Sequence, residues 1–155
     1  MGRQVTERVI SLGFTGTRRG MSALQLAAVA ERLCVPGLEQ VHSGDCIGAD
    51  AQFHALAIVV PGKPVIHGHP PEDPRYRAFL TYNVENPPRP YLVRDRDIVA
   101  ASTHVVACPG EFVEVRRGSG TWATIRYAIA AGRPLDIIFP DGAVRTVRPE
   151  EATTP

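Results

Sequence analysis

Short apolar segments alternate with amphipathic runs along this chain. The apolar segments predict strands at Val9–Phe14, Gln40–His42, Val65–His67, His104–Cys108 and Leu135–Phe139. The amphipathic runs predict helices at Ser22–Leu33, Gly48–Val59, Leu92–Ala101 and Thr121–Ala131. Strands that alternate with helices are typical of an α/β fold with a mostly parallel sheet, and we expect that fold class here.

The end of the chain predicts a change in strand direction. Asp141 and Gly142 follow Pro140 and form a typical hairpin-turn pair. They lead into Ala143–Val147, which we expect to be a short antiparallel edge strand. Residues 148–155 are expected to form a frayed tail.

A proline-rich segment from His69 to Pro90 interrupts the alternation. It is longer than a usual connection in an α/β domain, and such loops in compact domains are either disordered or functional. We expect a lid or rim over a ligand cleft, with Arg75, Arg77 and Tyr82 as candidate contacts.

The loop between the first strand and the first helix has the residues of a phosphate-binding loop. Gly16 lets the backbone approach an anion, Thr17 adds a hydroxyl, and Arg18 adds a fixed positive charge. No Gly-Lys-Ser/Thr sequence follows, so this is not a Walker A loop. The glycine spacing also misses the strict dinucleotide fingerprint.

A second loop of the same kind precedes the last predicted helix. Gly118 and Gly120 leave room for an anion, while Ser119 or Thr121 can cap the helix, whose first N–H groups attract negative charge. One such loop alone would be an ordinary strand-to-helix turn. Two of them favour a phosphate site, and we expect them to meet at one edge of the sheet.

A third loop, Ser43–Asp50, again joins a strand to a helix. We expect Gly44, Asp45 and Gly48 to shape the floor of the pocket near a ribose or base. Asp50 is better explained as a carboxylate at a helix start, where the helix dipole favours it.

Composition sets the class of protein. With 155 residues, of which 44% are hydrophobic and 21% charged, we expect one compact soluble domain over residues 1–155. No apolar run approaches the roughly 20 residues that span a membrane, and the first residues lack the core of a signal peptide, so we expect a cytoplasmic protein. Cys34, Cys46 and Cys108 have no C-x-x-C spacing, which indicates reduced thiols rather than a zinc site.

The net charge of +1 gives the chain no electrostatic basis for binding duplex DNA. Several arginines nevertheless lie near predicted loops, a pattern better suited to a small phosphorylated ligand. We therefore expect a small-molecule nucleotide ligand and no nucleic-acid partner.

The order of these motifs resembles the SLOG superfamily, which unites the Smf/DprA DNA-processing proteins with the Lonely Guy nucleotide hydrolases. The resemblance rests on Gly13–Arg18, Ser43–Asp50, Tyr91–Val99 and Gly118–Trp122, and it spans the chain from about Val9 to Gly142. It implies a Rossmann-like three-layer domain that binds a nucleotide or nucleotide-derived ligand at the carboxyl ends of the strands. It also implies a homo-oligomer.

This chain departs from the Lonely Guy motif P-G-G-x-G-T-x-x-E at its catalytic position. Thr124 stands where that family has glutamate. Arg94 or Arg96 can replace the arginine that the family carries before the motif, so we include Arg94 among the ligand-binding residues. The resemblance to small single-domain members implies nucleotide binding, in a sensing or carrier module.

Two alternative functions stay open. Asp45 and Glu72 could supply the acid and the assisting carboxylate of a nucleotide N-glycoside hydrolase or transferase. We interpret Asp97 as an ion-pair partner of Arg94 or Arg96. A single-stranded nucleic-acid binding protein is the second alternative, and steep salt dependence would be its signature.

Histidines at the same edge raise the question of a metal. His67 and His69 point to one side of an extended chain, and His42 ends a neighbouring predicted strand. No acidic residue accompanies them at a fixed spacing, so we predict no metal site and identify no cofactor beyond the nucleotide itself.

Overall fold

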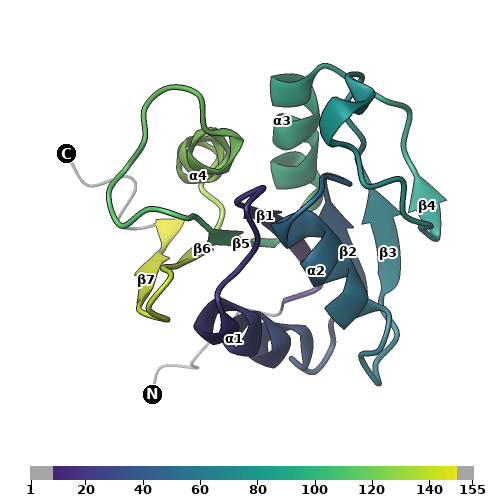
Figure 1. Ribbon diagram of the computed structural model, residues 1–155. Coiled ribbons are helices and arrows are strands. Elements are labelled where there is room, and N and C mark those ends of the chain that lie inside the picture. The colour runs from purple at the N-terminus through teal and green to yellow at the C-terminus, as the bar shows by residue number, and fades with distance from the viewer. Residues whose placement is uncertain (1–8, 150–155) are drawn as a thin grey trace.

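The computed structural model describes residues 9–149. Within this range one sheet of seven strands has the order β4-β3-β2-β1-β5-β6-β7 (Figure 1). The strands are β1 (Ser11–Gly16), β2 (Gln40–Ser43), β3 (Val65–Gly68), β4 (Val84–Glu85), β5 (His104–Cys108), β6 (Leu135–Ile138) and β7 (Val144–Val147). The helices are α1 (Ala23–Leu33), α2 (Ala49–Ala57), α3 (Tyr91–Ala101), α4 (Gly120–Ala130) and the short 3₁₀ helix η1 (Pro74–Tyr76).

The sheet reverses its winding at its centre. β1 pairs in parallel with both β2 and β5, the chain builds β2 to β4 on one side of β1, and β5 to β7 lie on the other. The carboxyl ends of β1 and β5 therefore meet at a topological switch point, where open α/β sheets bind their ligands. Among the seven strands described, only β7 runs antiparallel to its neighbour, with Leu135 opposite Val147.

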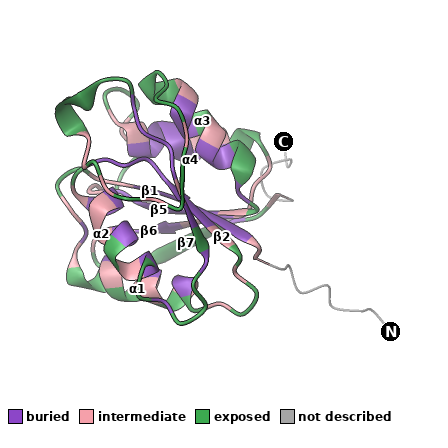
Figure 2. Cartoon of the chain, turned by 90° about the vertical axis from the view of Figure 1, so that its right-hand side faces the viewer, coloured by how far each residue is buried: buried purple, intermediate pink, exposed green. Residues whose placement is uncertain are grey.

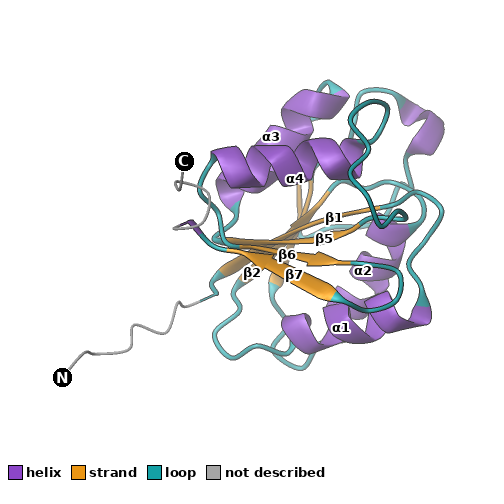
Figure 3. Ribbon diagram, turned by 90° about the vertical axis from the view of Figure 1, so that its left-hand side faces the viewer, coloured by secondary structure: helices purple, strands orange, loops and turns teal. Residues whose placement is uncertain are grey.

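Helices cover both faces of the sheet, so the fold has three layers. α1 and α2 pack on one face, and α3 and α4 pack on the other (Figure 3). Buried residues concentrate on the sheet and on the helix faces that turn toward it (Figure 2). Phe14 and Phe53 stack in the first core with ring centroids 4.4 Å apart, while Trp122 and Ile125 belong to the core on the opposite face.

The start of α1 shows how a local sequence fixes an element boundary. The Gln25 N–H donates to the Ser22 hydroxyl at 3.1 Å, and the Ser22 N–H donates to the Gln25 side-chain oxygen at 2.9 Å. This capping box satisfies two N–H groups that the helix leaves free. The chain between β1 and α1 is consequently a defined loop, and it carries part of the site described below.

The expected α/β class, with a mostly parallel sheet and an antiparallel edge strand, is confirmed. Two elements of the proline-rich segment were not predicted: η1, and β4, which pairs in parallel with β3. A two-residue strand is too short to show alternation, so its sequence carries no strand signal. The first strand begins at Ser11 rather than Val9 and continues to Gly16, so part of the first glycine loop is strand.

Of the tail predicted to fray, only residues 148 and 149 fall in the described part of the chain. No helix within residues 9–149 has the length and apolar character that a membrane crossing requires.

Candidate functional site

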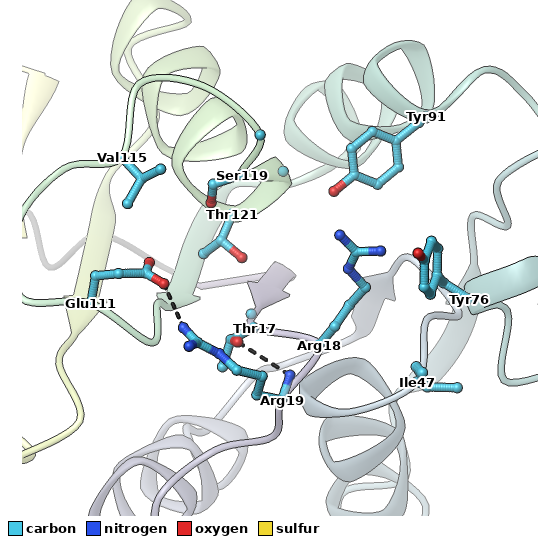
Figure 4. Close-up of a pocket in the computed structure, with 13 residues that line it drawn as sticks. Thr17, Arg18, Arg19, Ile47, Tyr76, Tyr91, Glu111, Val115, Ser119 and Thr121 are labelled. Atoms are coloured by element: carbon cyan, nitrogen blue, oxygen red, sulfur yellow. Dashed lines mark hydrogen bonds and ion pairs between the residues drawn. The ribbon is translucent and has the colours of Figure 1, made fainter.

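A cleft of about 440 Å³ opens at the switch point, at the carboxyl ends of β1 and β5 (Figure 4). Both predicted phosphate loops contribute to it. The lining residues are Gly16, Thr17, Arg18, Arg19, Ile47, Tyr76, Tyr91, Glu111, Val115, Gly118, Ser119, Gly120 and Thr121. The structure therefore brings together two loops that lie about a hundred residues apart in the sequence.

The loop after β1 is held by its backbone. The Thr17 N–H donates to the Cys108 carbonyl at 3.1 Å, and the Thr17 carbonyl accepts from the N–H groups of Gly20 and Ala49. The Thr17 hydroxyl accepts from the Arg19 N–H at 3.2 Å. These bonds fix the loop against β5 and the start of α2.

The first turn of α4 forms the opposite wall. Ser119 is the N-cap residue, and its hydroxyl accepts from the Trp122 N–H at 3.2 Å. The first N–H groups of a helix have no acceptor within the helix, and the helix dipole adds partial positive charge at this end. Gly120 and Thr121 thus place backbone donors at the edge of the cleft.

Arg18 is the cation best placed to meet an anion. Its side chain is exposed, its Cζ lies 4.0 Å from the ring centroid of Tyr76, and no carboxylate in the described residues pairs with it. Gly48 has a positive φ of 85°, and a Cβ at this position would collide with the Arg18 carbonyl. Gly48 is not among the residues that line the cleft, and its lack of a Cβ allows α2 to begin against the Arg18 backbone.

Arg19, a guanidinium of the first glycine loop, forms a charged pair with Glu111, which was not among the predicted site residues. The Arg19 guanidinium lies 2.6 Å from one Glu111 oxygen, and the Trp122 indole N–H donates to the other at 2.9 Å. Glu111 is the one carboxylate among the described residues that line the cleft. Its position just after Pro109-Gly110, at the end of β5, was the feature of the sequence that could have indicated Glu111 as a site residue.

Arg94 lies in a layer beneath the cleft rather than in its lining. Its guanidinium donates to the Gly44 carbonyl at 2.6 Å and pairs with Asp95 at 2.7 Å, and both side chains are buried. Burial raises the pKa of Asp95 and of nearby Asp50 to about 6, although Arg94 opposes the shift. Gly44 and Arg94 therefore support the loop that carries Ile47 and do not themselves reach the cleft.

The prediction that Asp97 forms an ion pair with Arg94 or Arg96 was wrong. Asp97 pairs with Arg89 at 2.8 Å, whereas Arg94 pairs with its sequence neighbour Asp95. Arg96 instead places its Cζ 4.6 Å from the ring centroid of Tyr127.

The two candidate catalytic carboxylates are not in the cleft. Asp45 is fully buried and accepts from Arg77 at 2.7 Å, from the Leu80 N–H at 3.1 Å and from the Tyr82 hydroxyl at 2.7 Å. Glu72 is exposed on the proline-rich segment. Arg77 and Tyr82, expected at the rim of a ligand cleft, therefore contact Asp45, and the residue that this segment contributes to the cleft is Tyr76.

The three histidines form a compact cluster. His42 Nδ1 lies 2.9 Å from His69 Nε2, and the rings of His42 and His67 stack with centroids 4.4 Å apart. Burial and the neighbouring rings lower the pKa of His42 to about 3, and burial lowers that of His69 to about 4. Among the residues described, no group of His, Cys, Asp and Glu side chains has an arrangement that could hold a metal ion.

No protein-family model matches the chain, and no curated protein matches it. Its fold is similar to that of a molybdenum cofactor binding protein from the phototrophic bacterium Rippkaea orientalis, with a TM-score of 0.63, 15% identity, and coverage of 86% of this chain and 78% of the other. It is also similar to TM1055, a structural genomics target, with a TM-score of 0.58, 17% identity, and coverage of 81% and 72%. At these identities the likeness concerns the fold.

Proposed function

We propose that the cleft binds the phosphate of a nucleotide or nucleotide-derived ligand, and that the chain is a sensing or carrier module of the SLOG type. The observation that carries this proposal is the meeting of two glycine loops around Arg18, a guanidinium without a carboxylate partner in residues 9–149. Backbone N–H groups, hydroxyls and a guanidinium are the donors that phosphates prefer. A structural neighbour that is a cofactor binding protein is consistent with this function.

The positions of the carboxylates favour ligand binding without turnover over N-glycoside hydrolysis. Such hydrolysis needs an acid or nucleophile near the scissile bond. Asp45 is enclosed by three donors, and Thr124, at the family's glutamate position, donates its hydroxyl to the Gly120 carbonyl at 2.8 Å. Glu111 is engaged by Arg19 and Trp122.

Calorimetric titration with AMP tests the phosphate site. We expect Arg18→Ala to weaken binding by about 1–3 kcal/mol, or about 5- to 150-fold, because a charge-assisted hydrogen bond to phosphate is lost. Arg117→Ala is the matched control, since Arg117 is exposed and does not line the cleft. If both substitutions weaken binding equally, Arg18 contributes only through the net charge of the protein. If Arg18→Ala leaves the affinity unchanged, Arg18 does not contact the phosphate.

Mass spectrometry of small molecules released from the denatured protein tests binding against turnover. Recovery of an intact phosphorylated ligand supports a binding module. Release of free adenine during incubation with AMP would instead favour the N-glycoside hydrolase.

A further inference from the structure

A second, smaller cavity borders the cleft at Arg18. Its volume is about 170 Å³, and it is lined by Arg18, Cys46, Pro71, Asp73, Tyr76 and Tyr91. Arg18, Tyr76 and Tyr91 line both cavities. We call the smaller cavity the tyrosine slot, because Tyr76 and Tyr91 are the two aromatic residues that line it.

The Tyr76 wall of the tyrosine slot is held by two contacts outside the slot and by one with Arg18, which lines it. The Ile47 N–H donates to the Tyr76 carbonyl at 2.9 Å. The next residue, Arg77, pairs with buried Asp45 at 2.7 Å. The guanidinium of Arg18 stacks on the Tyr76 ring. The backbone that carries the Tyr76 ring is therefore held in place before any ligand arrives, which lowers the entropic cost of binding.

The Tyr91 wall links the tyrosine slot to the phosphate loops. Tyr91 is the first residue of α3, and the buried guanidinium of Arg94 lies 4.9 Å from its ring centroid. A Cβ at Gly120 would collide with the Tyr91 hydroxyl, so Tyr91 reaches the first turn of α4. In Figure 4 the Arg18 side chain lies between Thr121 and Tyr76, and Tyr91 lies above it.

We propose that the tyrosine slot binds the base of the nucleotide whose phosphate occupies the cleft. A nucleotide carries a planar aromatic base at one end and an anion at the other. The tyrosine slot offers aromatic rings for the base, and the adjoining cleft offers hydrogen-bond donors for the anion. Stacking on an aromatic side chain is favourable for every base, and the neighbouring guanidinium adds a second planar surface. Occupation of the slot by a base rests on the proposed function, since it requires the phosphate to bind in the cleft.

Comparing AMP with ribose 5-phosphate tests the tyrosine slot separately from the cleft. Both ligands carry the same phosphate and sugar, but only AMP carries a base. We expect AMP to bind the unmodified protein about 5- to 150-fold more tightly than ribose 5-phosphate, as stacking of one base predicts. Equal affinities would overturn base binding and leave the phosphate site intact. Failure of AMP, ribose 5-phosphate and inorganic phosphate alike would overturn the proposed function as well.

Substitutions at the two walls sharpen this test. Tyr76→Ala and Tyr91→Ala should each bring the ratio of the two affinities toward one, whereas Tyr76→Phe keeps the ring and should keep the ratio. Because the ratio is measured within each variant, a general loss of phosphate affinity does not alter the conclusion, and thermal unfolding establishes that each variant is folded. An unchanged ratio in both alanine variants would show that the base lies elsewhere.

Discussion

The cleft at the ends of β1 and β5 and the corner at the ends of β2 and β3 are both rich in polar side chains, but they differ in whether their main charged group has a partner. In the corner, Asp45 is enclosed by three donors, and His42 and His69 contact each other. In the cleft, Arg18 is exposed and faces backbone donors across open space.

This difference separates structural polar groups from binding groups. A buried charge that is paired and hydrogen-bonded holds the fold, and breaking the pair leaves an uncompensated charge. An exposed cation beside free N–H groups has no such structural role, because water already solvates it. The corner therefore supports the cleft. Asp45 anchors Arg77, and Arg77 is the next residue in the chain after Tyr76, which lines the cleft.

Removing the Asp45 carboxylate should have the largest effect. We expect Asp45→Ala to lower the free energy of unfolding by about 3–5 kcal/mol, because the Arg77 guanidinium would lose its buried partner. Chemical denaturation measures this change. Asp73→Ala, which breaks a solvent-exposed ion pair with Arg75, is the control and should change stability far less, because solvent screens that pair. A loss of stability no greater than that of the control would contradict a structural role for Asp45.

The histidine cluster should make the protein less stable in acid. The native pKa values of His42 and His69, about 3 and about 4, lie below the unfolded value of 6.5, so the unfolded state binds more protons as the pH falls below 6.5. We expect each histidine to cost about 1 kcal/mol of stability between pH 6.5 and pH 5.5.

A double variant isolates this contribution. Asp50 and Asp95, with pKa values raised to about 6, act in the opposite direction below that pH, but they are present in both proteins and cancel in the comparison. Denaturation at the two pH values should show a loss about 2 kcal/mol smaller in His42→Gln/His69→Gln than in the unmodified protein. Equal losses would show that the two rings titrate in the native state as they do in the unfolded state.

Periodicity and loop composition were sufficient to predict most of the fold and the two walls of the cleft. Amphipathic runs of about three turns, such as α1, repeat often enough to define a helix. Gly118–Thr121 was predictable because glycine and hydroxyl residues before a helix have a direct physical role there. Both features depend only on residues that are close together in the chain, so they can be recognised from the sequence.

Partners far apart in the sequence could not be predicted. Arg77 and Tyr82, which satisfy Asp45, lie 32 and 37 residues beyond it, inside a segment without periodicity. A carboxylate in a glycine loop was therefore interpreted as a candidate acid, although its burial depends on contacts that only the folded chain creates. Glu111 was missed for the related reason that its loop carries no repeating pattern.

The smallest expected effect concerns Glu111, the carboxylate in the cleft lining, which has partners as Asp45 does in the corner. Its pair with Arg19 is largely exposed and is worth about 0–1 kcal/mol. Removing its charge in Glu111→Gln frees Arg19 for an incoming anion, so we expect inorganic phosphate to bind up to about 5-fold more tightly at low ionic strength.

The single tryptophan, Trp122, hydrogen-bonds to Glu111, so its fluorescence offers a second reading of the same titration. Glu114→Gln is the matched control, since Glu114 lies in the same loop but pairs with Arg126 at 3.1 Å outside the cleft. If both variants gain affinity equally, the gain reflects net charge. A gain confined to Glu111→Gln shows that the ion pair competes with the ligand for Arg19.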